Sequence, residues 1–137
     1  MKLSARNQFE GIVSNVVEGA VNGIVTVQSG ELSITGTISM AAIKELGLEK
    51  GAKATAIVKA TEVMVGLGDL KLSARNQLRG TVAHIEKGAV NAIVTISLPA
   101  GVAVSATISM AAVAELGLTE GCEAVAVIKA TSVMIGA

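Results

Sequence analysis

The chain has 137 residues, of which 51% are hydrophobic, and its 11 basic and 11 acidic residues cancel to a formal net charge of zero. A neutral chain has no overall field that would draw it to nucleic acid or to an anionic membrane. A single cysteine, Cys122, excludes an intramolecular disulfide and fits a reducing compartment. The first residues, MKLSARNQ, lack the apolar core of a signal peptide, so we expect a cytoplasmic protein.

Each half of the chain predicts short strands and one helix. Runs of β-branched residues near period two predict strands, whereas Ala, Met, Leu and Glu after Ser39 predict a short helix that Ser39 caps and Gly47 ends. In the first half the predicted strands are Phe9–Val17, Val21–Val27, Glu31–Ile38, Ala54–Ala60 and Glu62–Val65. The uncharged stretch 88–114 partly alternates polar with apolar residues and contains Pro99, so we do not expect it to cross a membrane.

A tandem repeat organises nearly the whole chain. KLSARNQ stands at residues 2–8 and again at 71–77, and the motifs GAVN, TISMAA, ELGL and KATxVM follow in the same order in both halves. The spacing between the copies grows by one residue near Pro99, which indicates an insertion in a loop. We therefore predict a first domain at residues 1–66, a linker at 67–70 and a second domain at 71–137.

The element inventory predicts an all-β fold made of two tandem small OB-like Greek-key barrels, each with one short helix. Domains of this size are marginal alone, because a domain of about 60 residues buries only about 60% of the surface that its unfolded chain exposes. The chain is also too apolar to leave the surfaces of two isolated barrels uncovered. We therefore expect a homo-oligomer.

Comparison of the two copies separates retained charges from drifting ones. Three cations and one acid per copy keep their positions: Lys2/Lys71, Arg6/Arg75, Lys59/Lys129 and Glu45/Glu115. Other charged positions change sign between the copies, as solvated surface positions do. Small polar residues are retained beside these charges: Ser4/Ser73, Asn7/Asn76, Asn22/Asn91, Thr37/Thr107, Ser39/Ser109 and Thr61/Thr131.

This retained set has the chemistry of an anion site. Hydroxyls, amides, backbone N–H groups and a capped helix start donate hydrogen bonds to anionic oxygens, and Arg6 and Lys59 supply positive charge. A second interpretation stays open, in which the residues serve the fold alone. Lys59 would then lie along the surface, and Ser39 would only cap its helix.

Catalytic and metal-binding constellations are not predicted. His84 and Cys122 do not recur in the other copy, and we expect His84 to be an exposed strand residue and Cys122 a small apolar one. The methionines, Met64 and Met134 among them, are predicted to fill the core. Nucleic-acid binding on an OB barrel relies on aromatic side chains that stack on bases, and this chain has no Trp, no Tyr and only Phe9.

SARNQ, GAVN, the TIS-to-LGL segment and KATxVM, in that order and twice, resemble the molbindin (Mop/TOBE) family of cytoplasmic molybdate-binding proteins. The resemblance covers both halves and is closest to the two-domain storage form. It implies OB-like domains, assembly of three chains, and molybdate or tungstate bound between domains as an oxyanion, with no cofactor and no other metal. Many relatives carry Pro-Trp where this chain has Thr61-Glu62 and Thr131-Ser132.

Carried over by motif, the resemblance implies two kinds of oxyanion site. The first uses the SARN segment, the hydroxyl residue at the helix start and the lysine segment: Ser4, Arg6, Ser39, Lys59 and Ala60, with Ser73, Arg75, Ser109, Lys129 and Ala130 in the second copy. The second uses the GAVN segment: Ala20, Val21 and Asn22, with Ala89, Val90 and Asn91.

The sequence thus predicts a non-enzymatic protein that binds and stores molybdate or tungstate in the cytoplasm and buffers molybdenum for cofactor synthesis. Tetrahedral dianions differ in size more than in charge, so a rigid cage of donors can favour molybdate over sulfate. The alternative is an oxyanion-sensing, self-assembling regulatory module that acts through a protein partner. We expect no nucleic-acid or membrane partner.

Overall fold

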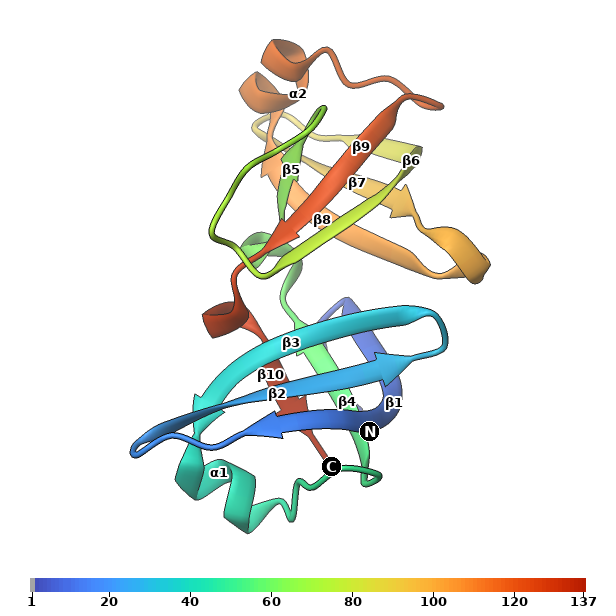
Figure 1. The fold of residues 1–137 in the computed structure, drawn as a ribbon. Coiled ribbons are helices and arrows are strands. Elements are labelled where there is room, and N and C mark those ends of the chain that lie inside the picture. The colour runs from blue at the N-terminus through green and yellow to red at the C-terminus, as the bar shows by residue number, and fades with distance from the viewer. Residues whose placement is uncertain (1) are drawn as a thin grey trace. The chain divides into compact units, whose positions relative to one another are not determined.

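The structure is a computed structural model that describes residues 2–137. Two five-stranded antiparallel sheets carry the fold, and each is accompanied by one short helix (Figure 1). Among the described residues, no helix is long and apolar enough to span a membrane. The all-β prediction is confirmed.

The first sheet has the strand order β10-β4-β1-β2-β3. Its strands are β1 (Asn7–Val17), β2 (Asn22–Ser29), β3 (Leu32–Ser39), β4 (Lys53–Val58) and β10 (Met134–Gly136). Helix α1 (Met40–Glu45) follows β3, and the 3-10 turn η3 (Ala130–Ser132) precedes β10. Because β3 also contacts β10 and η3, the sheet curls back on itself as a small barrel does.

The second sheet repeats this arrangement in the order β5-β9-β6-β7-β8. Its strands are β5 (Met64–Gly66), β6 (Asn76–Lys87), β7 (Asn91–Ser97), β8 (Ala103–Ser109) and β9 (Glu123–Ile128). The remaining elements are α2 (Met110–Leu116), η1 (Ala60–Glu62) and η2 (Pro99–Gly101). The hairpin β7–β8 has five residues between the paired Ser97 and Ala103, whereas four separate Gln28 from Ser33, so the inserted residue lies in the loop as predicted.

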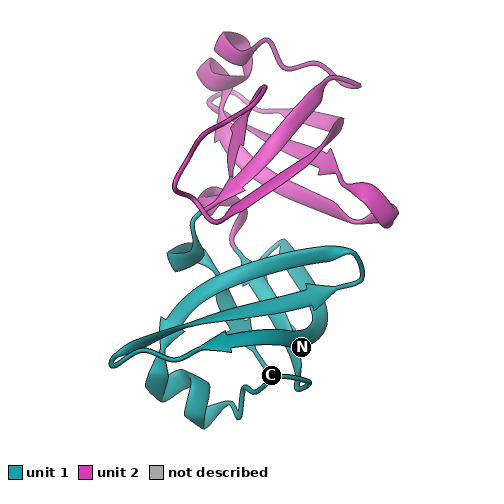
Figure 2. Cartoon of the chain, viewed as in Figure 1, with its two compact units in different colours: residues 1–58, 129–137 teal, residues 59–128 magenta. Residues whose placement is uncertain are grey.

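The last strand of each half pairs in the other half's sheet. β10 pairs with β4 through Met134↔Ile57, and β5 pairs with β9 through Met64↔Val127. In Figure 1 the red strand β10 accordingly lies beside β4, among the strands of the first half. The two compact units are residues 1–58 with 129–137, and residues 59–128 (Figure 2). They differ from the predicted domains 1–66 and 71–137, because β5 and β10 have nearly the same sequence and fit the same edge of either sheet.

Strand β1 pairs with two neighbours, β4 and β2, along different parts of its length. Its first half pairs with β4 from Asn7↔Val58, and its second half pairs with β2 up to Val17↔Ile24. A register shift after Val13 marks a β-bulge, which bends the strand. Gly11 stands just before it, where an added Cβ would overlap the carbonyl oxygen of Gln28. Gly80 in β6 is in the same situation with Ser97, so the close strand approach requires glycine in both copies.

Several element boundaries differ from the predicted ones by one or two residues, and two of them lie beside predicted site residues. β1 begins at Asn7 rather than Phe9, and the predicted strand Ala54–Ala60 ends at Val58. Beyond it the backbone forms η1, in which the N–H of Glu62 donates to the Lys59 carbonyl at 2.9 Å, so strand pairing resumes only at Met64. The predicted helix is confirmed: Ser39 caps α1, and Gly47 beyond its end has φ +63.

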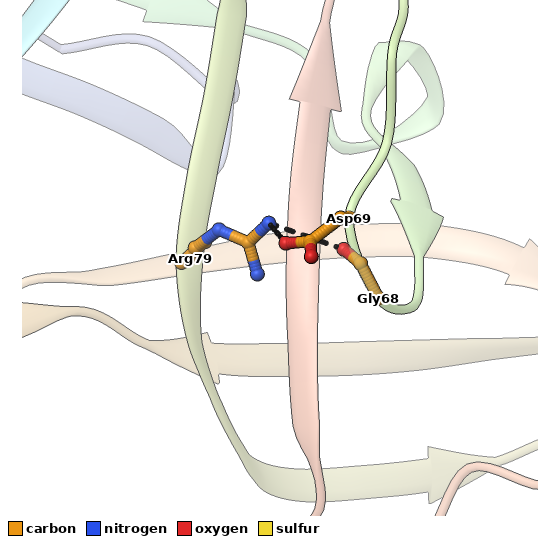
Figure 3. Close-up of polar contacts among 3 residues, drawn as sticks. All are labelled: Gly68, Asp69 and Arg79. Atoms are coloured by element: carbon orange, nitrogen blue, oxygen red, sulfur yellow. Dashed lines mark hydrogen bonds and ion pairs between the residues drawn. The ribbon is translucent and has the colours of Figure 1, made fainter.

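The predicted linker follows β5 and is held within the second unit. Arg79 of β6 donates from Nη2 to the Asp69 carboxylate at 2.7 Å and to the Gly68 carbonyl at 3.3 Å (Figure 3). Gly66 lies so close to Leu70 that a Cβ on the glycine would overlap the leucine side chain. The Arg79–Asp69 ion pair is highly exposed and contributes little to stability on its own.

Candidate functional site

The SARN segment leads directly into the first strand of each sheet. Ser4 and Arg6 precede β1, Ser73 and Arg75 precede β6, and all four are exposed. A glutamine that follows each segment folds back onto it. Gln8 Nε2 donates to the carbonyl oxygens of Leu3 at 3.2 Å and Ala5 at 2.9 Å, and Gln77 makes the same two bonds to Leu72 and Ala74 at 3.2 and 3.1 Å.

The lysine segment begins where the β1–β4 ladder ends. The last pair of that ladder is Asn7↔Val58, so Arg6 and Lys59 are each one residue beyond it. The second copy repeats the arrangement: Asn76↔Ile128 ends the β6–β9 ladder, followed by Arg75 and Lys129. Both lysines are exposed, and the alanines after them are buried: Ala60 at 8% and Ala130 at 7%.

The GAVN segment lies beside the helix start. Asn22 pairs with Ser39 in the β2–β3 ladder, and the N–H of Met40 donates to the Val21 carbonyl at 2.8 Å. Ser39 Oγ accepts from the N–H of Ala42 at 3.0 Å. The second copy repeats these contacts. Asn91 pairs with Ser109, the N–H of Met110 donates to the Val90 carbonyl, and Ser109 Oγ accepts from the N–H of Ala112. The valine side chains project into solvent, with Val21 75% and Val90 74% exposed.

Within one unit, the residues of the first carried-over set lie at different ends of the sheet. Ser39 lies beside Asn22, near the end of β1 that Val17 forms, whereas Arg6 precedes the other end of the same strand. The first set, with Ser4, Arg6 and Ser39, is therefore not assembled in a single unit. The second set, Ala20–Asn22, is contiguous with Ser39. Helix α1 has only six residues, and the Ser39 hydroxyl already engages one of its N-terminal amides, so the helix start adds little charge of its own.

Two groups of residues are corrected by the structure. Asn7 and Asn76, placed among the polar residues of an anion site, are 2% and 3% exposed, and Asn76 Nδ2 donates to the Ile128 carbonyl at 3.2 Å. The Asn76 amide thus bonds its own strand partner in the core, and Asn7 is the equivalent buried residue of β1. The prediction that Met64 and Met134 fill the core is wrong: each is 47% exposed. Successive strand residues point to opposite faces, and in β10 it is Ile135, 9% exposed, that points inward.

One pair of residues beside the SARN segments was not among the predicted site residues. Gln8 and Gln77 are identical in the two copies and end the repeated heptapeptide, which was the available signal. Nothing in the local pattern shows that a strand residue turns its amide back onto the preceding loop. Only the structure shows that these two glutamines donate hydrogen bonds to the SARN segment.

The remaining titratable residues are surface groups. His84 is exposed on β6, with Nδ1 3.2 Å from a Glu120 carboxylate oxygen, and Cys122 is a free, half-buried thiol before β9. Among residues 2–137, no three His, Cys, Asp or Glu side chains gather closely enough to hold a metal ion.

The fold defines a protein of two tandem small β-barrel domains with the same polar set in each. Residues 3–65 and 72–135 each match the family model of the TOBE domain. The chain belongs to the TOBE domain family, and the resemblance seen in its motifs is confirmed.

Several relatives carry names that refer to molybdenum. The molybdenum transport protein ModE of Herbaspirillum seropedicae is 40% identical over 138 residues, which are 98% of this chain and 51% of that protein. The probable molybdenum-pterin-binding protein of Haemophilus influenzae is 60% identical over 67 residues, 49% of this chain and 97% of that protein. This chain spans about half the length of its ModE relatives. The Haemophilus influenzae protein, in contrast, matches along nearly its whole length but covers only about half of this chain.

A solved structure has the same fold over the full chain. The cytoplasmic molybdate-binding protein ModG, with molybdate bound, matches with a TM-score of 0.96 and 44% sequence identity, and the match covers 99% of both chains. The agreement includes both barrels, so the OB-like fold prediction is confirmed.

Proposed function

We propose that this protein binds molybdate or tungstate reversibly in the cytoplasm and stores it for molybdenum cofactor synthesis, without catalysing a reaction. The observation that carries the proposal is the repetition of one exposed set in equivalent positions of both sheets. Arg6 and Lys59 flank the end of one ladder, and Arg75 and Lys129 flank the end of the other. The 44% identity to a molybdate-binding protein over the full chain supports it.

The chemistry of the set suits a tetrahedral dianion. Arginine and lysine donate charge-assisted hydrogen bonds, and the exposed hydroxyls of Ser4 and Ser73 add neutral donors. With 11 acidic residues elsewhere in a neutral chain, these cations act locally and not through the overall charge. The ligand enters as an intact oxyanion, so the protein needs neither a cofactor nor a resident metal.

The proposed assembly is a homo-oligomer, a trimer of two-domain chains. The first residue set is not assembled in a single unit, so a second copy of the chain completes it. The exposed apolar tips Val21 and Val90, beside Asn22 and Asn91, are suited to contact that copy. The second site type, at Ala20–Asn22 and Ala89–Asn91, would then lie where such tips meet.

Anion competition on the full chain tests the storage role. We expect tungstate to displace molybdate readily and sulfate to displace it poorly, because sulfate is smaller and leaves some donors beyond hydrogen-bond range. Two donors that the assembled site buries and sulfate leaves unpaired would cost about 1–3 kcal/mol each, which corresponds to discrimination of about 30-fold or more. Calorimetric titration measures the affinities, and sedimentation of the same samples measures the oligomeric state. Equal displacement by sulfate, or a stable monomer that still binds, would contradict the proposal.

A second function has one observation in its favour. The ModE relatives align with this chain over only 51% of their length, so the same two domains occur there within a larger protein. A regulatory module that reports oxyanion occupancy to a protein partner is the alternative function. Molybdate-dependent binding of a partner, with no change in the pool of molybdate held in cells, would favour it.

A further inference from the structure

The glutamine at the end of each repeated heptapeptide makes the same two hydrogen bonds in both copies. Gln8 Nε2 reaches the carbonyl oxygens of Leu3 and Ala5, and Gln77 Nε2 reaches those of Leu72 and Ala74, all between 2.9 and 3.2 Å. A primary amide carries two N–H hydrogens, one for each carbonyl. Each glutamine thus clamps two peptide groups of the loop that precedes its strand.

The clamp determines which way the loop amides point. A trans peptide is planar, with its C=O and its N–H directed to opposite sides. The Leu3 carbonyl shares a peptide with the N–H of Ser4, and the Ala5 carbonyl shares one with the N–H of Arg6. Because both carbonyls converge on one nitrogen of Gln8, the N–H groups of Ser4 and Arg6 face away from it. The same holds for Ser73 and Arg75 in the second copy.

We propose that Gln8 and Gln77 are positioning residues for oxyanion binding, an inference that rests on the function proposed above. They hold two backbone N–H donors beside the Arg6 and Arg75 side chains, aimed toward the face where the anion binds. They also keep two carbonyl oxygens, which would repel an anion, turned away from that face. The anchor itself is firm, since Gln8 is paired with Ile57 inside the β1–β4 ladder.

Replacement of both glutamines by methionine removes the donors with little change in side-chain length. In the variant Q8M/Q77M the two peptides are free to rotate, and we expect molybdate affinity to fall about tenfold or more. Selectivity should fall as well, because a loop that is no longer held adapts to the smaller sulfate. A purely structural glutamine would lower the melting temperature without changing the ratio of molybdate to sulfate affinity.

The chain offers a matched control in Gln28. Its Nε2 donates to the Gly30 carbonyl at 2.8 Å in a hairpin turn, so Q28M removes the same type of bond away from the SARN segment. We expect Q28M to bind molybdate as the unsubstituted chain does. If the double variant does not fold, the single variants Q8M and Q77M replace it. Each keeps one clamped loop, and each should weaken only part of the sites in a titration.

The outcomes separate this assignment from the proposed function. Unchanged affinity and unchanged molybdate-to-sulfate ratio in Q8M/Q77M would overturn the positioning role alone. A fall in affinity that disappears after correction for the folded fraction, or an equal fall in Q28M, would overturn it too. Failure of the unsubstituted chain to bind molybdate would instead overturn the proposed function, and the assignment with it.

Discussion

At the scale of single residues, the retained cations are the clearest product of comparing the two copies. Lys59 and Lys129 remain lysine while neighbouring charged positions drift, and both are exposed at the first residue after a buried strand. The exposure by itself fits a lysine that lies along the surface equally well. A substitution therefore has to decide between the two interpretations.

We expect K59A/K129A to weaken molybdate binding about tenfold or more, because each lysine supplies a charge-assisted hydrogen bond to the dianion. The melting temperature should stay nearly unchanged, since removing an exposed side chain leaves no cavity. Calorimetry and a thermal melt on the same protein measure both quantities.

Lys44 provides the control for this prediction. It is exposed, and the equivalent position of the second copy carries alanine, Ala114. K44A should change neither affinity nor stability. Equal affinities in K59A/K129A and the unsubstituted chain would assign Lys59 to the surface alone.

At the scale of elements, the serine before each helix has two separable roles. Ser39 Oγ accepts from the Ala42 N–H, and Ser109 Oγ accepts from the Ala112 N–H, both at 3.0 Å. Capping is therefore established for both residues. Anion binding by their hydroxyls remains a prediction.

Aspartate replacements separate these roles. An aspartate keeps the cap acceptor, so S39D/S109D should retain the stability that S39A/S109A loses, about 1 kcal/mol per cap. If the hydroxyls also contact the oxyanion, S39D/S109D should bind molybdate much more weakly, because a carboxylate repels a dianion at close range. Denaturant titration and calorimetry distinguish the variants. Full molybdate affinity in S39D/S109D would leave the serines with capping alone.

At the scale of the whole molecule, the exchange of β5 and β10 makes each half dependent on the other. In the sheet β10-β4-β1-β2-β3, the edge strand β10 is separated from its neighbour β4 by residues 59–133, which include the whole second unit. The connection out of β4 is held by buried Ala60 and Val63, which are 8% and 2% exposed. Folding β5 back onto its own half would disturb this packing.

We expect an isolated segment 1–70 to form a dimer by reciprocal exchange. Met64–Gly66 of one copy would take the place that Met134–Gly136 occupies beside β4. Sedimentation measures the association. V65P in the same segment removes a backbone donor from the exchanged strand and should shift the dimer toward monomer. A monomer of 1–70 as stable as the full chain would show that β5 returns to its own sheet.

The sequence alone determined the repeat, the strand and helix inventory, the Ser39 cap and the retained cations. These follow from local signals: side-chain periodicity, turn and cap residues, and direct comparison of two copies. Only the tertiary structure decided the pairing of β5 and β10, the burial of Asn7 and the orientation of the Gln8 amide. Met-Val-Gly and Met-Ile-Gly carry no local information that distinguishes one sheet edge from the other, and hydrogen bonds from a side chain to distant backbone leave no periodic trace in the sequence.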